Sequence, residues 1–231
     1  MAIALPGLAL PGGVGATPRT MAMTARNMPA IPPLGPDGRF RTINSGLDGA
    51  QRLWHVRAAL NVAALGCKGD GQKPLIDAYN RFITANRTVL ATADRSVRAR
   101  FQGEFGGGWQ MRHDAYQTSL YNFFAQPFVQ SAFCAAAAPI AQAAGGVRPV
   151  GVAAFADDAL PRLEAPFLDY YRRYAAYEVA LADYERRLAS GVEERAAPPP
   201  ASPLLDYGMD RMSGWAPAPA PAPRIGYDLR R

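Results

Sequence analysis

The sequence has few of the residues that usually build metal or redox sites. Its 231 residues include two cysteines, Cys67 and Cys134, and two histidines, His55 and His113. A structural zinc site needs four N, S or O ligands, and neither cysteine has another cysteine or a histidine at ligand spacing. We therefore predict no metal site and no cofactor, and we expect both histidines to be satisfied core or helix-surface residues.

Long apolar runs and blocks of basic charge are also missing. No apolar run reaches the roughly 18 residues that a membrane-spanning helix needs. The net charge is +6, but no five consecutive residues are basic, whereas a nucleic-acid-binding chain concentrates its charge on one face. We predict no membrane span and no nucleic-acid partner. A cytoplasmic nucleic-acid or assembly protein stays as an alternative interpretation.

Strand-like alternation of apolar and polar residues is absent too, and apolar residues instead recur every three or four positions. Asn44 or Ser45 is the expected N-cap of the first helix. One buried stripe follows, formed by Leu53, Val56, Leu60, Ala64 and Cys67. The sequence predicts an all-α fold, an irregular bundle of five or six helices.

Glycine and proline divide the chain after this first helix. The periodic run over residues 75–101 is one helix, or two with a break near Asn86. A short helix is expected over residues 152–160, and a separate last helix over residues 167–188.

Most of the 21 prolines lie in the first 46 and the last 40 residues. We therefore predict a helical domain over 47–191, a disordered leader over 17–46 and a disordered Pro/Ala-rich tail over 192–231. Residues 1–16 hold a short apolar stretch that ends in small residues at signal-peptidase spacing, but they lack a charged n-region. They are interpreted as a truncated signal peptide or as an apolar tail.

The two cysteines are candidates for a disulfide. Cys67 lies on the apolar stripe of the first helix, and Cys134 lies beside Phe133 in an alanine-rich helix. Cysteines that face a core are either buried free thiols or bonded to each other. A total of two, together with an export signal, favours the Cys67–Cys134 disulfide. A nucleophilic cysteine, which needs a neighbouring base, is the weakest interpretation.

Acidic and aromatic residues leave a hydrolase open as an alternative. A glycosidase needs two carboxyl groups across a cleft. The acidic residues outside obvious solvent-facing stripes are Glu104, Asp114, Asp157, Asp158 and Glu164. With His113 and the aromatic residues between 116 and 167 they would form an envelope hydrolase, but this pattern has little specificity.

The last predicted helix carries a strict heptad stripe, formed by Phe167, Tyr170, Tyr174, Tyr177, Leu181, Tyr184 and Leu188. A buried tyrosine hydroxyl needs a hydrogen-bond partner, so four tyrosines suggest a half-wet position. Tyr170, Tyr174, Tyr177 and Tyr184 are therefore a candidate binding surface for a protein partner. The alternative is an internal seam, which the need to cover the preceding phenylalanines favours.

Three segments of the sequence, "INSGLDGAQRLWHVRAALNVAALGC", "YNFFAQP" and "AFCAAA", resemble an uncharacterised family of exported helical proteins of alphaproteobacteria. The resemblance covers about residues 40–190. It implies export and a pair of cysteines, and it implies no activity. We therefore expect an exported, periplasmic or secreted, helical binding or structural domain of the bacterial cell envelope. A non-enzymatic role is favoured.

Overall fold

The computed structural model describes residues 31–190 and residue 203. The chain divides into two compact units, and the unit Ile31–Ser213 contains all of these residues. The other unit, Met1–Ala30 with Gly214–Arg231, lies outside the described residues. The predicted signal peptide, the first part of the predicted leader and nearly all of the predicted tail also fall outside them.

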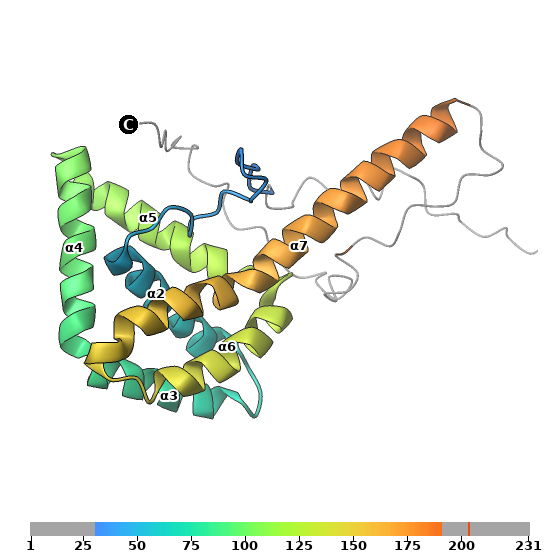
Figure 1. Ribbon diagram of the computed structural model, residues 1–231. Helices are drawn as coiled ribbons and strands as arrows, with labels where there is room; N and C mark the ends of the chain where they lie inside the picture. Colours follow the sequence, from blue (N-terminus) through green and yellow to red (C-terminus); the bar gives the residue numbers. More distant parts are fainter. Residues whose placement is uncertain (1–30, 191–202, 204–231) are drawn as a thin grey trace, which may run out of the picture. The chain divides into compact units, whose positions relative to one another are not determined.

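The described residues form six α-helices and no strand beyond one isolated bridge between Leu34 and Phe40 (Figure 1). The predicted all-α bundle is thereby confirmed. The helices are α2 (Gly49–Gly66), α3 (Gln72–Ala85), α4 (Arg87–Phe105), α5 (Trp109–Phe124), α6 (Gln130–Ala144) and α7 (Val152–Ala189), with the 3₁₀ turn η1 (Pro149–Gly151) before α7.

Helix α2 begins with a capping box. The side chain of Asp48 accepts a hydrogen bond from the backbone N–H of Gln51 at 2.9 Å, and the Gln51 side chain accepts one from the Asp48 N–H at 3.2 Å. This reciprocal pair satisfies two backbone donors that the first turn leaves open. The predicted N-cap at Asn44 or Ser45 was therefore wrong, and Asn44 has another role, described below.

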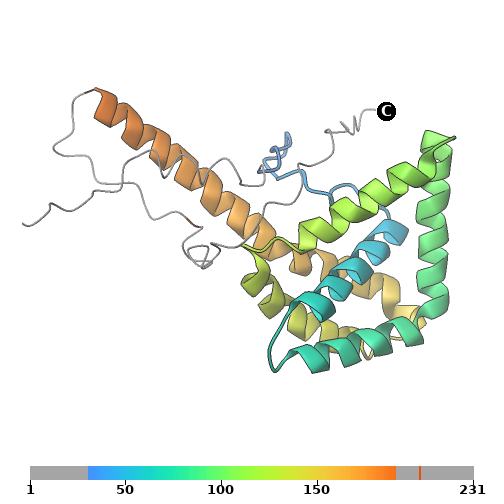
Figure 2. The ribbon, with the colours of Figure 1, turned by 180° about the vertical axis from the view of Figure 1, so that it is seen from behind.

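Helix α2 is the central helix of the unit, and α3, α4, α5, α6 and α7 all contact it (Figures 1 and 2). The predicted stripe is buried, but so are residues on other faces, among them Trp54, His55, Ala59 and Ala63. The expectation of a single buried stripe was thus incomplete. Ala59 and Ala63 are small, so neighbouring helices can approach α2 closely at these positions.

The periodic run over residues 75–101 forms two helices, which confirms the alternative with a break near Asn86. The Asn86 side chain is fully buried, and its Nδ2 donates to the backbone carbonyls of Phe82 and Val147, each at 3.0 Å. The asparagine therefore binds the end of α3 to the loop before η1 and fixes the corner between α3 and α4.

Helix α7 is one continuous helix of 38 residues, not the two helices that were expected. Pro161 and Pro166 lie inside it, where each removes a backbone hydrogen bond at a cost of roughly 3 kcal/mol. Leu160, Leu163 and Phe167 are buried through the same region. Burial of such side chains stabilises by about 1.5–3 kcal/mol each, which offsets the cost of the prolines.

Residues 31–48 pack on the helices, so the predicted boundary at residue 47 was wrong and the unit begins at Ile31. The ring of Phe40 lies edge-on to Tyr171 of α7, with 5.6 Å between centroids. A tight turn precedes it, in which Gly38 has φ 71° and the Asp37 carboxylate accepts from the N–H of Arg39 at 3.2 Å. This packing could not be predicted from the sequence, because the segment has no helical period.

Candidate functional site

A histidine lies fully enclosed in the middle of the helical unit. His55 of α2 has an exposed fraction of 0%. Its Nδ1 lies 2.7 Å from Oδ1 of Asn44, and its Nε2 lies 2.9 Å from the hydroxyl of Tyr116 on α5. Both ring nitrogens therefore have partners, as expected for a satisfied core histidine.

Glu164 extends this contact set to α7. Nδ2 of Asn44 donates to Oε1 of Glu164 at 3.1 Å, and the hydroxyl of Thr42 donates to the same oxygen. We call the five residues Thr42, Asn44, His55, Tyr116 and Glu164 the His55 network. It joins the segment before α2 to three helices of the unit.

The hydrogen bonds assign the tautomer of His55. Asn44 uses Nδ2 toward Glu164, so its Oδ1 faces His55 and can only accept. His55 therefore carries its proton on Nδ1, and its Nε2 accepts the hydroxyl proton of Tyr116. Burial lowers the pKa of His55 to about 3, because the charged imidazolium would lose its hydration. The ring is neutral near pH 7.

The His55 network has the groups of an acid–base relay but no route to a substrate. Trp54 stacks on the Tyr116 ring with centroids 6.0 Å apart, and Phe101 lies 5.3 Å from the same ring. A general base must come within hydrogen-bond reach of the proton that it removes. An enclosed His55 cannot do so, and we interpret the network as the fastening of residues 31–48 to the helices.

The carboxyl groups of the alternative hydrolase interpretation do not gather around one cleft. Asp157 pairs with Arg52 at 2.6 Å and Asp158 pairs with Arg162 at 2.8 Å, all on the surface. Glu104 and Asp114 are exposed on other helices, and only Glu164 of this set belongs to the His55 network.

His113 is 3% exposed and lies in an aromatic cluster with Trp54 and Phe101. Its Nδ1 lies 3.5 Å from the Asp114 carboxylate. Its Nε2 has no hydrogen-bond partner among the described residues, so the expectation of a satisfied histidine fails here. The aromatic side chains around it are core, and they form no open platform.

A shallow hollow of about 450 Å³ lies along the outer face of α5. It is lined by Asp114, Gln117, Thr118, Tyr121 and Asn122. Burial and the neighbouring Tyr79 raise the pKa of Tyr121, while Arg57 opposes the rise. The hollow contains a single carboxyl group and no histidine, so it offers no pair of groups for acid–base chemistry.

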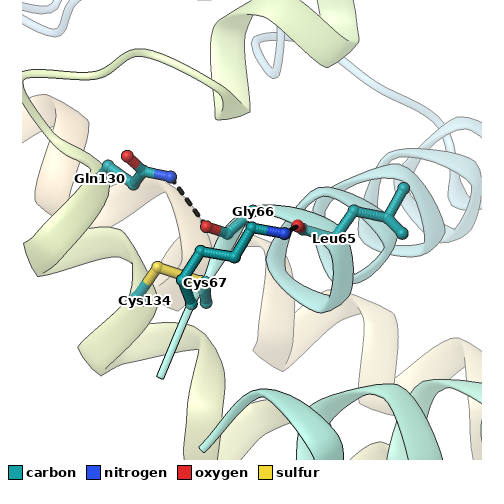
Figure 3. Close-up of a disulfide and its surroundings, with 6 residues drawn as sticks. Leu65, Gly66, Cys67, Gln130 and Cys134 are labelled. Atoms are coloured by element: carbon teal, nitrogen blue, oxygen red, sulfur yellow. Dashed lines mark hydrogen bonds between the residues drawn. A yellow bond between two sulfur atoms is a disulfide. The ribbon is translucent and has the colours of Figure 1, made fainter.

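Cys67 and Cys134 form a disulfide, with Cα atoms 5.5 Å apart, as predicted (Figure 3). It joins the C-terminal end of α2 to α6. Nε2 of Gln130 donates to the backbone carbonyl of Gly66 at 2.9 Å beside the bridge, and the Lys68 ammonium donates to the carbonyl of Leu65 at 2.7 Å. These two bonds satisfy carbonyls that the last turn of α2 leaves open.

The first half of the tyrosine stripe is internal. Phe167, Tyr170 and Tyr174 are buried, with exposed fractions of 0%, 1% and 7%. Phe123 of α5 stacks on Phe167 at 4.6 Å, and Phe128 lies 4.4 Å from Tyr170. The corner between α5 and α6, which carries Phe123 and Phe128 and is called the α5–α6 corner below, therefore covers this part of α7. Tyr170 and Tyr174 are not a binding surface, which corrects the prediction for these two residues.

The second half of the stripe is only half-buried. Tyr177, Leu181, Tyr184 and Leu188 keep the three- and four-residue spacing, and all four have intermediate exposure. We call these four residues the α7 seam. In Figures 1 and 2 this end of α7, drawn in orange, extends past the other helices of the unit. The predicted tyrosine surface is therefore narrowed to Tyr177 and Tyr184.

Opposite charges flank the two edges of the α7 seam. Glu178 and Glu185 follow Tyr177 and Tyr184 and occupy the heptad e positions on one edge. Arg187 precedes Leu188 on the other edge, where it pairs with Asp183 at 2.7 Å. The pKa of Tyr174 in the buried half of the stripe is raised, mainly by burial and further by the negative charge of Glu178 on this acidic edge.

No family model, curated protein or solved structure matches this chain. Among residues 31–190 and 203, no three His, Cys, Asp or Glu side chains are grouped so that they could hold a metal ion. No helix of this part of the chain is long and apolar enough to cross a membrane.

Proposed function

We propose that this chain is an exported helical domain of the bacterial cell envelope that binds a protein partner through the α7 seam. The observation that carries the proposal is the change in burial along α7. One uninterrupted heptad stripe is buried at Tyr174 and half-buried from Tyr177 onward. A domain that needed the stripe only for its own core would have no reason to continue it past the other helices.

Export is supported by the disulfide and by the apolar N-terminal stretch. Disulfides form and persist in oxidising compartments such as the periplasm and the extracellular space, and they are rare in the cytosol. The Cys67–Cys134 bridge therefore favours a periplasmic or secreted protein. The resemblance to exported helical proteins of alphaproteobacteria points the same way.

The composition of the α7 seam favours a protein partner over a small ligand. Tyrosine is enriched in protein interfaces because it buries a large apolar ring while its hydroxyl stays hydrated. The seam is a ridge on a helix, whereas small-molecule sites are concave. A second amphipathic helix laid along α7 would cover Tyr177, Leu181, Tyr184 and Leu188 together.

Photo-crosslinking in the native host tests this proposal. Tyr184 is replaced by p-benzoylphenylalanine, which keeps an aromatic ring at the seam, and the envelope fraction is irradiated. The control carries the same group at Val179, which is 70% exposed on the opposite face of α7. We expect one dominant crosslinked protein from position 184 and none from 179. Equal labelling from both positions, or none from either, would contradict the proposal.

A further inference from the structure

A half-buried apolar ridge next to a long chain end raises the question of what covers it when no partner is bound. The α7 seam ends at Leu188, and the chain continues to Arg231. The candidates are a second copy of this protein and the chain's own C-terminal segment. Steric clashes and charge repulsion both disfavour a second copy.

A parallel dimer through the α7 seam is blocked by the fold. In a parallel pair, the same face of both helices must be free along the contact. Immediately before Tyr177 that face is occupied, because Phe123 and Phe128 of the α5–α6 corner pack on Phe167 and Tyr170. Two such corners would fall in the same space between the helices.

An antiparallel dimer is opposed by charge. In antiparallel pairs the e positions of the two helices face each other, as do the g positions. Glu178 of one copy would then face Glu185 of the other, and the edges with Arg173 and Arg187 would also meet. Like charges placed opposite each other are destabilising. The seam therefore suits a segment whose sequence differs from its own.

We propose that residues 203–213 of the same chain fold back onto the α7 seam and cover it. Pro203 is buried, although twelve residues separate it from Ser190, the C-cap of α7. The compact unit that contains the helices also runs to Ser213. The segment after Pro203 is the apolar part of the tail, with Leu204, Leu205, Tyr207, Met209 and Met212.

The connecting residues are long enough for this return. Residues 190–203 extended as polyproline II would span about 40 Å. The α7 seam is about 17 Å long, since its ends are eleven residues apart at 1.5 Å each. Covalent linkage gives the segment an effective concentration on the order of 1 mM at the seam. A weak apolar contact therefore suffices, and a tighter-binding partner can displace it.

This inference rests on the proposed function, because it assigns to the partner-binding seam an internal competitor. Its test uses hydrogen exchange of the full-length protein. In a chain with Leu204→Asp and Leu205→Asp, the amides of residues 177–189 should exchange at least about tenfold faster, since the uncovered helix end opens more often. Amides of α2 should be unchanged, which shows that the unit is folded. Leu229→Asp, a similar change near the chain end, is the matched control and should have no effect.

A synthetic peptide of residues 203–213, added to the Asp variant at roughly 1 mM, should restore slow exchange. Equal exchange of residues 177–189 in the variant and the unmodified chain would overturn the inference. Protection that disappears when the unmodified protein is diluted would overturn it as well, because a second copy would then be the cover. In the host, the Asp variant should give more crosslinking from position 184. If hydrogen exchange shows that residues 203–213 cover the seam, but no protein is crosslinked from position 184, the proposed function is rejected and the inference about the tail stands.

Discussion

The enclosed imidazole of His55 makes the stability of this protein depend on pH in a defined window. In the unfolded chain the pKa of a histidine is near 6.5, whereas in the folded protein burial lowers it to about 3. Between these two values the unfolded state binds a proton that the folded state does not. The contribution of His55 is therefore complete above about pH 6.5 and is lost progressively as the pH falls toward 3.

The magnitude follows from the separation of the two pKa values. Each pH unit well below 6.5 costs about 1.4 kcal/mol until the folded-state pKa is reached. Between pH 7 and pH 5 the loss amounts to about 2 kcal/mol from this one residue. For a unit of this size that corresponds to a fall in Tm of roughly 4–8 °C.

The assay is urea unfolding of the full chain at pH 7, 6 and 5, with the His55→Gln variant beside it. Glutamine can accept the hydroxyl proton of Tyr116 but does not titrate. The variant starts less stable, because it loses the bond to Asn44, and between pH 7 and pH 5 its stability should fall by about 2 kcal/mol less than that of the unmodified chain. His113→Gln removes the other buried imidazole and is the matched control, which should keep the slope that depends on His55. Parallel pH profiles of the unmodified chain and His55→Gln would refute the reasoning.

Three further changes test other parts of the structure. Replacing Cys67 and Cys134 by alanine should lower the free energy of unfolding by up to about 4 kcal/mol, since the bridge closes a loop with a sequence separation of 67. A reductant should lower the urea midpoint of the unmodified chain but not that of the alanine variant. An equal shift of the midpoint in the two proteins would contradict this. Tyr170→Ala should cost about 3–5 kcal/mol, as buried aromatic truncations do, and Tyr177→Ala less than about 1 kcal/mol; calorimetric melts showing equal losses would mean that the two positions are equally buried. Asn44→Ala should cost about 1–3 kcal/mol, because it leaves the buried Nδ1–H of His55 without its acceptor; an unchanged melt would show that residues 31–48 are not fastened through the His55 network.

The helical period was enough to predict the class of the fold and the heptad stripe, and it left the break near Asn86 as one of two alternatives. It failed where tertiary contacts override local signals. The sequence suggested a short helix over 152–160 and a separate helix over 167–188, but burial of the residues around Pro161 and Pro166 keeps α7 continuous. The segment 31–48 carries no period, so its attachment through Phe40 and Asn44 had no sequence signal.

The candidate site was predicted in part for a similar reason. The 3–4 spacing marks every position of the tyrosine stripe equally, from Phe167 to Leu188. Which half of the stripe is covered depends on where the α5–α6 corner lies, and that is a long-range contact. The disulfide could be anticipated because a chain with two core-facing cysteines allows one pairing. The partners of His55 come from positions 11 and 61 residues away, which no local pattern indicates.

The redox state of the two cysteines in the native host tests export most directly. Cells are quenched with acid, free thiols are alkylated under denaturing conditions, and the intact mass of the protein is measured before and after reduction. An exported protein should take up no alkyl group before reduction and two after it, since Cys67 and Cys134 are bonded. The same mass should show an N-terminus beyond the apolar stretch of residues 1–16. Two alkyl groups before reduction on an unprocessed chain would place the protein in a reducing compartment and contradict the proposed envelope function.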